Sequence, residues 1–313
     1  MGPPKMAGAN ADQVIVLVNP MAGRGPLLSQ VDQLHVLLSA KGFEVDVLND
    51  LGEASEKAGK SFRAGRLRAL ISVGGDGTVA EIANRTDPGV PICVYPSGTA
   101  NLLAKYLRMR PDPKFIAAVV DRGIQLRMDA ALANGRVFLL HVGCGFDAAV
   151  VNQVHRQRLE ARSGHISYWS YVNPILRTIR TYNYPEMEVR WERAPIANAC
   201  GCPDPWVVRW LFVFNVPLYG WGLPLASWAD ATDGFLDVCA FQKGFFWNGL
   251  RYLAAAQCGW HRRLRDCQIA RVDRLRVVAE EPVPYQLDGD PGGWLPLEIE
   301  AAAGRLTFLA PNS

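Results

Sequence analysis

The sequence lacks most of the patterns that would place a protein in a class at once. Its seven cysteines are odd in number, scattered and without a CxxC pair, which argues against a disulfide framework or a zinc site. We therefore expect reduced thiols in a cytoplasmic protein, and the role of Cys200 and Cys202, a close pair in a Pro/Gly-rich loop, stays open. No stretch reaches the ~20 apolar residues that span a bilayer, so we expect any membrane contact to be peripheral.

The chain also lacks a strong excess of charge. A net charge of +3 permits contact with anionic lipid or nucleotide but does not require nucleic acid, and we expect no nucleic-acid partner. None of the five histidines has metal-ligand or catalytic spacing. Apolar residues, by contrast, make up 49% of the 313 residues, which is enough for substantial cores, and the length predicts two domains.

Strand and helix patterns alternate in the first part of the chain, after a leader at 1–12 that reads as flexible and has no signal-peptide core. Apolar, β-branched runs predict strands, and helical spacing predicts helices between them. The strands are expected at 13–19, 43–48, 68–73 and 91–95, and the helices at 27–41, 53–64 and 78–84. This alternation predicts a parallel α/β sheet, whose ligands bind at the carboxyl ends of the strands.

The pattern changes after about residue 127, where strand-like segments predominate. They are expected at 136–142, 186–192, 206–216, 234–242, 268–280 and 283–287, with helical stretches at roughly 148–182 and 244–265. The last part of the chain, 297–300 and 306–309, is again strand-like. A mostly β second domain is therefore expected.

Three glycine loops follow the first, third and fourth predicted strands. In Gly74-Gly75-Asp76-Gly77-Thr78, glycines would let the backbone approach a phosphate, and the next helix would point its amides at it. Asp76 would offer a carboxylate to Mg²⁺ or to a substrate proton; alone, the run also suits a β-turn. The loop at 19–25 is neither a P-loop nor GxGxxG. The third loop, 96–101, suits either ribose or phosphate binding or capping of a helix at 102–107.

Taken together, and in this order, these loops resemble the diacylglycerol kinase catalytic-domain family, which includes bacterial lipid kinases, sphingosine kinases and ceramide kinases. Further marks are Glu81 and Asn84, Gly143-Cys-Gly-Phe-Asp147-Ala148, Asp233-Gly-Phe-Leu-Asp237 and Asp288-Gly-Asp290, so the resemblance spans about 13–309. It implies an ATP-binding α/β domain at 13–127 with a returning segment at 297–313. It also implies a β-rich lipid-substrate domain at 128–296, with the active site in the cleft between the two.

The resemblance also implies roles for single residues. Nucleotide contacts are expected from Asn19, Pro20, Gly23, Arg24, Gly25, Gly74, Gly75, Gly77, Thr78, Glu81, Ser97, Gly98, Thr99 and Asn101. Asp76 is expected near the γ-phosphate, through Mg²⁺ and its waters, with Asp288 and Asp290 as further catalytic carboxylates in the same cleft. Either Asp76 or Asp288 would accept the proton of the lipid hydroxyl, directly or through water. Asp147 matches a position near the lipid headgroup. A structural Mg²⁺ site is expected at Asp230, Asp233 and Phe235.

Two departures from the family pattern occur: Ala22 stands where serine is frequent, and Asp290 stands where glutamate is usual, which shortens that carboxylate's reach. Arg158 and Arg162 lie four residues apart on one helix face. They are candidates for an anionic headgroup or phosphate, although a solvated charged face is the more ordinary reading.

We thus expect an ATP- and Mg²⁺-dependent lipid kinase, cytoplasmic and peripherally membrane-associated. Its acceptor could be diacylglycerol, phosphatidylglycerol, a sphingoid base or ceramide. The alternatives are a soluble NAD kinase-like enzyme, or a non-catalytic nucleotide- or lipid-binding regulator. The aromatic-rich segments 219–228 and 245–260 suit either a membrane interface or the domain core, and we favour the core. Because homodimers are the commonest oligomers of soluble proteins, a homodimer is the oligomeric state that we expect first.

Overall fold

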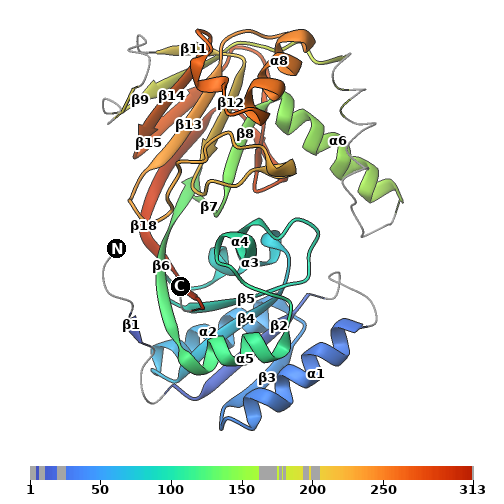
Figure 1. Ribbon diagram of the computed structural model, residues 1–313, viewed down its shortest axis with the longest axis vertical. Coiled ribbons are helices and arrows are strands. Elements are labelled where there is room, and N and C mark those ends of the chain that lie inside the picture. Colours follow the sequence, from blue (N-terminus) through green and yellow to red (C-terminus); the bar gives the residue numbers. More distant parts are fainter. Residues whose placement is uncertain are drawn as a thin grey trace. The chain divides into compact units, whose positions relative to one another are not determined.

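The computed structural model describes residues 5–6, 11–19, 26–161, 175, 178, 181–192, 197–198 and 205–311. The chain folds into two compact units, one made of 1–128 with 304–313 and the other of 129–303 (Figure 1). The predicted fold class, an α/β part with a parallel sheet followed by a mostly β part, is confirmed.

A parallel sheet forms the centre of the first unit. Its strands are β2 (Gln13–Val18), β3 (Glu44–Leu48), β4 (Leu67–Gly74), β5 (Pro91–Pro96) and the end of β18 (Leu297–Leu309), in the order β3-β2-β4-β5-β18. The pairs between neighbours are all parallel. Strands β4 and β5 are buried along their whole length, which explains their largely apolar sequences. The four predicted strands are confirmed to within one residue.

Five helices accompany this sheet in the described residues: α1 (Pro26–Ser39), α2 (Leu51–Arg63), α3 (Asp76–Arg85), α4 (Leu102–Tyr106) and α5 (Pro113–Arg122). Figure 1 shows α1 and α5 side by side on one face of the sheet, and α2 covers β2 on the other. Helix α5 was not predicted, although its signals are present. Asp112 caps it by accepting from the Lys114 amide at 3.0 Å, and Gly123 ends it with φ of +63°.

The second unit is a sandwich of two antiparallel sheets. One has the order β11-β9-β15-β18, with β11 (Trp206–Val208), β9 (Met187–Trp191) and β15 (Arg274–Val278). The other has the order β10-β14-β13-β12-β8-β16-β17. Its strands are β10 (Ala197–Asn198), β14 (Cys267–Val272), β13 (Leu236–Phe241), β12 (Trp210–Phe214), β8 (His141–Gly145), β16 (Pro284–Leu287) and β17 (Asp290–Trp294).

Three further strands, one long and two short, complete the architecture. β6 (Ile124–Ala133) was not predicted; it pairs at its start with β1 (Lys5–Met6) and at its end with β7 (Arg136–Phe138). The predicted strand at 136–142 is therefore two strands, β7 and β8. Conversely, the two strand-like segments at 297–300 and 306–309 form one continuous strand, β18.

Two of the predicted long strands each cross from one sheet to the other. Segment 206–216 is divided by Arg209 into β11 and β12, and segment 268–280 is divided by Asp273 into β14 and β15. The Arg209 guanidinium fixes its corner by donating to the Tyr184 carbonyl and pairing with Glu186. Hydrophobic periodicity continues through such a corner, because both halves keep one face in the same core.

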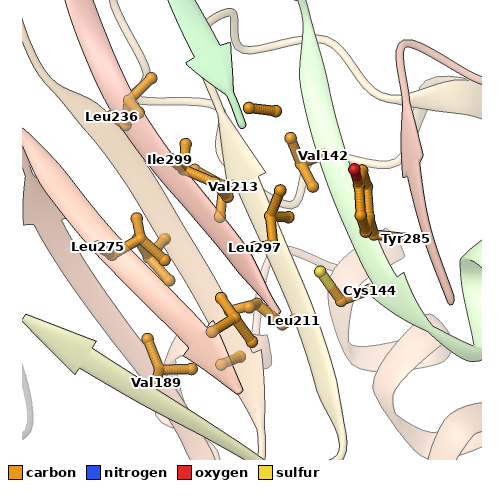
Figure 2. Packing of buried hydrophobic residues seen from close by; sticks show 14 of the residues in the cluster. Val142, Cys144, Val189, Leu211, Val213, Leu236, Leu275, Tyr285, Leu297 and Ile299 are labelled. Carbon is orange, nitrogen blue, oxygen red and sulfur yellow. The ribbon is translucent and has the colours of Figure 1, made fainter. Parts of the chain in front are cut away.

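The core between the sheets follows from strict alternation along the strands. In β12, Leu211 and Val213 point towards the facing sheet, where Leu275, Leu297 and Ile299 meet them (Figure 2). These side chains are at most 1% exposed, and burying each contributes roughly 1.5–3 kcal/mol.

The other face of the β12 sheet carries a second, aromatic core. Trp210, Phe212 and Phe214 lie on that face. Helix α8 (Phe246–Gln257) and the segment around the short helix η2 (Gly220–Gly222) cover them. Leu225 and Tyr252 are part of this core. Segment 219–228 therefore packs the core as favoured from the sequence, whereas α8 buries only one side.

The second unit also contains the helices α6 (Phe146–Ala161) and the short η3 (His261–Arg263). The predicted helical stretch at 148–182 continues beyond α6 into positions of which 162–174, 176–177 and 179–180 lie outside the described residues. Among the helices that are described, none combines the length and the apolar character needed to cross a bilayer.

Candidate active site

The loops after β4 and β5 pack backbone against backbone. The Ser97 amide donates to the Gly74 carbonyl at 3.0 Å. A Cβ atom on Gly98 would lie 2.6 Å from the Gly75 Cα, and one on Gly74 would lie 2.4 Å from Thr78 Oγ1. A side chain at 98 would therefore push the two loops apart, and one at 74 would collide with Thr78 of its own loop. At least part of the glycine pattern thus serves the approach of two loops to each other.

Asn19 joins the end of β2 to this pair of loops. Its Nδ2 donates to Thr78 Oγ1 at 2.9 Å, and its backbone amide donates to the Val73 carbonyl at 3.1 Å. Three chain segments far apart in sequence are thereby brought to the carboxyl edge of the sheet, as predicted for a parallel arrangement. Pro20, Gly23, Arg24 and Gly25, which were predicted to contact the nucleotide, lie outside the described residues.

Asp76 is the first residue of α3, and its carboxylate caps a different helix. Oδ2 accepts from the Leu102 amide at 2.9 Å and Oδ1 from the Leu103 amide at 3.0 Å, at the start of α4. Burial raises the pKa of Asp76, although these amides and the charge of Lys105 act to lower it. The side chain is half-buried. It is therefore a carboxylate in a partly desolvated place, held in position by the backbone.

The loop that carries α4 is closed by Asn101. This residue has φ of +49°, its Oδ1 accepts from the Gly98 amide at 3.0 Å, and its Nδ2 donates to the Gly98 carbonyl at 2.7 Å. Thr99 lies exposed between them. Asn101 thus shapes the loop that aims the α4 amides at Asp76, a role that its resemblance to a nucleotide-binding residue did not predict.

The remaining predicted nucleotide contacts all lie on α3. Gly75 is the N-cap of this helix and Gly77 lies in its first turn. Glu81 forms an ion pair with Arg85 at 3.5 Å, one turn along. This pair is largely in solvent and contributes little to stability.

The Asp76 cluster fits a magnesium-bound phosphate. Each carboxylate oxygen keeps a second acceptor site beside its amide bond, and Mg²⁺ is commonly held by one or two carboxylates together with water and substrate phosphates. Ser97 Oγ is buried and has no hydrogen-bond partner among the described residues, so it offers a further oxygen. No group of three His, Cys, Asp or Glu side chains that could hold a metal occurs in the described part of the chain. An ion here would therefore take most ligands from water and phosphate.

A second polar cluster surrounds Asp147 in the other unit. Asp147 lies in the first turn of α6, and its carboxylate accepts from Tyr219 Oη at 2.5 Å and from Gln286 Nε2 at 2.9 Å. Loss of solvent raises the pKa of Asp147, against the lowering effect of these two hydrogen bonds. Gln286 in turn accepts from the Gly289 amide at 2.7 Å through its Oε1. The predicted headgroup residue is thus rigidly held.

Asp288 and Gly289 form the two-residue turn of the β16–β17 hairpin. Both have positive φ, +53° and +91°, as a type I′ turn requires. The Asp288 carboxylate reaches back to β8: Oδ2 accepts from the Leu139 amide at 2.7 Å, and Oδ1 accepts from the amides of Leu140 and His141 at 2.8 and 3.0 Å. Three amide donors to one carboxylate fix the side chain in place and join the hairpin turn to residues 139–141.

The other predicted catalytic carboxylate, Asp290, is the first residue of β17 and is half-buried. Through Gln286, the structure brings the Asp288–Gly289 turn together with Asp147. The predicted convergence of Asp288 and Asp76, which belong to different units, stays a prediction.

The expected structural Mg²⁺ site does not have a fitting donor set. The Asp233 carboxylate pairs with the Arg271 guanidinium and accepts from the Phe235 amide at 2.9 Å. Asp230 accepts from the amide and hydroxyl of Thr232 at 3.0 and 2.7 Å. Because a guanidinium already neutralises Asp233, we assign no metal chemistry to this loop. Arg162, the side chain of Arg158, and Cys200 and Cys202 lie outside the described residues.

Sequence reasoning missed the partners of Asp147. Tyr219 was noticed only as an aromatic residue, and Gln286 was not noticed. A signal for Gln286 does exist: it is the one polar residue in the apolar run Val283-Pro-Tyr-Gln-Leu287, and it is 1% exposed. A polar side chain at such a position needs hydrogen-bond partners, and Asp147 supplies one.

Comparison with known proteins agrees with this arrangement. Residues 13–133 match the family model described as diacylglycerol kinase catalytic domain, and residues 140–310 match the YegS C-terminal NAD kinase beta sandwich-like domain. A diacylglycerol kinase of Bacillus subtilis is 24% identical, with 91% of each chain covered, and one of Mycobacterium tuberculosis is 26% identical, with 96% of each covered. An uncharacterised Synechocystis protein is 28% identical over 95% of this chain and 70% of its own length.

Solved structures show the same fold. The crystal structure of a putative diacylglycerol kinase from Bacillus anthracis has a TM-score of 0.70 at 22% identity, with 97% of each chain covered. An NAD kinase from Archaeoglobus fulgidus in complex with ATP has a TM-score of 0.51 at 13% identity, covering 95% of this chain and 93% of the other. Since the two family models together extend over nearly the whole sequence, this chain belongs to the diacylglycerol kinase family of lipid kinases.

Proposed function

We propose that this protein transfers the γ-phosphoryl group of ATP to a hydroxyl group of a lipid, with Mg²⁺ as the metal. The family is one of ATP-dependent kinases. The observation that carries the proposal is the placement of Asp76. Its carboxylate stands at the carboxyl edge of a parallel sheet, between two glycine loops, and is held by the α4 amides.

The chemistry asks mainly for positioning and charge stabilisation, because phosphoryl transfer requires little covalent work from the protein. Bound Mg²⁺ would supply neutralisation of phosphate charge beside Asp76 and Ser97. Asp76 itself has a pKa raised by burial, which makes its carboxylate a better proton acceptor than an exposed one. In this proposal, Asp76 therefore receives the proton of the lipid hydroxyl, directly or through one water.

The acceptor side of the reaction is assigned to Asp147. Tyr219 and Gln286 each donate to one of its oxygens, and both oxygens keep a further acceptor site for a hydroxyl. A lipid that carries a second hydroxyl beside the reacting one would meet a fixed acceptor there. Phosphatidylglycerol, a sphingoid base and ceramide carry such a second hydroxyl, whereas diacylglycerol has only the hydroxyl that reacts.

An acceptor panel tests the proposal. The purified protein is incubated with labelled ATP, Mg²⁺ and mixed micelles of each lipid, with NAD as a soluble acceptor, and the product is identified by its mass. We expect phosphorylation of one or more lipids and none of NAD. Phosphorylation of NAD alone would show a soluble NAD kinase. Tight ATP binding without turnover on any acceptor would show a non-catalytic binding protein.

A further inference from the structure

Helix α8 presents an apolar side to solvent. Its buried positions are Gly249, Tyr252 and Ala256, which lie on the aromatic core. The large apolar side chains left exposed on the helix and at its two ends are Phe245 at 64%, Trp247 at 67%, Leu250 at 49%, Leu253 at 50% and Trp260 at 61%.

Three of these exposed side chains form one stripe on the helix. At 3.6 residues per turn, Trp247, Leu250 and Leu253 fall within an arc of about 120° on the side away from the buried residues. Phe246, whose ring centroid is 5.0 Å from that of Trp247, falls in the same arc. An amphipathic helix on a domain surface normally exposes polar residues there, so α8 has the opposite of the usual pattern on its outer side.

The helix that bears the stripe is firmly seated. A Cβ atom on Gly249 would lie 2.7 Å from the Trp210 ring, so the helix backbone rests directly on that indole. Tyr252 Oη donates to Asp266 Oδ2 at 2.8 Å, and Arg251 pairs with the same carboxylate. The stripe is therefore a fixed surface of the second unit.

The charged residues in the sequence segment that contains α8 are all basic. Between Asp237 and Asp266 there is no acidic residue, whereas Lys243, Arg251, Arg262, Arg263 and Arg265 are basic. Arg262 and Arg263 lie in η3, two and three residues after Trp260, and are exposed. Arg262 lies over the Trp228 ring at 4.5 Å. Within the described part of the chain, Asp266 is the one acidic partner of these five residues, and it pairs with Arg251.

We infer that the outer side of α8, with the arginines of 262–265, is a docking surface for a bilayer that contains anionic lipid. Exposed tryptophan, phenylalanine and leucine next to clustered arginine form an interfacial pattern: the apolar side chains enter the headgroup boundary and the arginines meet lipid phosphates. A protein partner would account for the apolar stripe but not for the arginines, whereas an anionic bilayer would contact both. The inference rests on the proposed function, since a lipid acceptor resides in a bilayer.

Vesicle co-sedimentation tests the surface without reference to turnover. The probes are vesicles of phosphatidylcholine, with or without phosphatidylglycerol. The double variant Trp247→Glu with Leu250→Glu should lower partitioning to vesicles by roughly tenfold or more. The double variant Arg263→Gln with Arg265→Gln should lower binding about fivefold per arginine on phosphatidylglycerol vesicles, and hardly at all on pure phosphatidylcholine.

The matched control is Val36→Glu, on the exposed side of α1 in the first unit, where the valine is 64% exposed. It should bind vesicles like the unaltered protein. Because the replaced side chains are exposed, all variants should keep the original melting temperature. Unchanged vesicle binding by the folded Trp247→Glu/Leu250→Glu variant would overturn the inference. If sedimentation velocity also showed that the unaltered protein is a dimer and this variant a monomer, α8 would instead be a contact between two copies of the chain.

Failure of the proposed function would look different. The folded α8 variant should keep its turnover on a short-chain diacylglycerol supplied as a monomer, and lose it on diacylglycerol embedded in vesicles. α8-dependent vesicle binding without any lipid phosphorylation would refute the kinase proposal and still support the docking surface. Turnover on vesicles that is insensitive to both double variants would refute the docking surface and leave the kinase proposal standing.

Discussion

Gly143 lies directly beneath the carboxylate of Asp147: a Cβ atom at position 143 would come within 2.0 Å of Asp147 Oδ2. The carboxylate has little freedom to move aside, because Tyr219 and Gln286 each hold one of its oxygens. Glycine at position 143 therefore leaves free the space that the Asp147 carboxylate occupies.

The substitution Gly143→Ala should accordingly destabilise the protein by about 1–3 kcal/mol and displace Asp147. Urea denaturation measures the first effect, and KM for the lipid acceptor measures the second, which should rise more than kcat falls. The matched control is Gly220→Ala, where an added methyl group meets nothing within 4 Å. If Gly143→Ala were as stable and as active as Gly220→Ala, the tight placement of Asp147 would be wrong.

The substitution Asp76→Asn separates helix capping from catalysis. The amide retains one oxygen for the α4 amides, so the free energy of unfolding should change by less than about 2 kcal/mol. Turnover should fall by roughly 100-fold or more, because the neutral side chain neither accepts a proton nor attracts Mg²⁺.

Asp112→Asn is the control for this substitution. Asp112 also caps a helix by accepting from a backbone amide, and it has no part in the proposed site. It should lose a comparable or smaller amount of stability with turnover unchanged. Near-normal turnover in folded Asp76→Asn, measured with saturating ATP and lipid, would remove Asp76 from the mechanism.

Asp288→Ala should be mainly a stability mutation. It leaves the amides of Leu139, Leu140 and His141 without their acceptor and places alanine at positive φ. Together these effects should cost about 2–4 kcal/mol. Asp288→Asn, which tolerates the turn conformation and keeps one oxygen, should lose less.

The neighbouring carboxylate supplies the control for position 288. Asp290→Ala, at a half-buried position, should change the urea midpoint little. If Asp288→Ala kept the original midpoint and lost all turnover, the residue would be catalytic, as the resemblance implied, and the structural role derived from its amide contacts would be incorrect.

His141 should make the protein sensitive to mild acid. It is 5% exposed, its ring centroid lies 4.8 Å from that of Tyr219, and burial lowers its pKa from 6.5 to about 4. The unfolded chain binds a proton as the pH falls below 6.5, while the folded protein does not until about pH 4. The free energy of unfolding contributed by this residue is therefore fully present above pH 6.5 and falls by up to about 3 kcal/mol towards pH 4.

His141→Phe keeps an aromatic ring in the same place and removes the titrating group. The difference in urea midpoint between pH 7 and pH 4.5 should shrink in this variant. His35→Phe, at an exposed position of α1, should leave the difference as it is. An unaltered pH dependence in His141→Phe would mean that other groups account for the acid sensitivity.

Much of the first unit could be predicted from the sequence. The apolar runs of β2, β4 and β5 and the helical periodicity of α1 and α2 are patterns among residues close together in the sequence. These elements were therefore located to within a few residues. The glycine loops after β4 and β5 were placed correctly at strand ends, because in an alternating α/β chain the loop after a strand opens at its carboxyl end. Even the Asp288-Gly289 turn carried its usual hairpin signal.

The sheet crossings of the second unit were not visible in this way. At Arg209 and Asp273 the apolar alternation runs on while the chain passes from one sheet to the other. Which sheet receives each half depends on partners as distant as Glu188 and Val207, or Gly145 and Trp210, which no local window contains.

The sequence by itself determined the kinds of element, the glycine loops and the carboxylates available for chemistry, because local sterics and hydrophobic periodicity act over a few residues. Only the tertiary structure decided what those carboxylates do. Asp76 is held by amides 26 and 27 residues away, Asp288 by amides 147 to 149 residues away, and the apolar side of α8 is left uncovered. A hydrogen bond or a buried face depends on which distant segments the fold brings together, and that is set by the packing of the whole sheet.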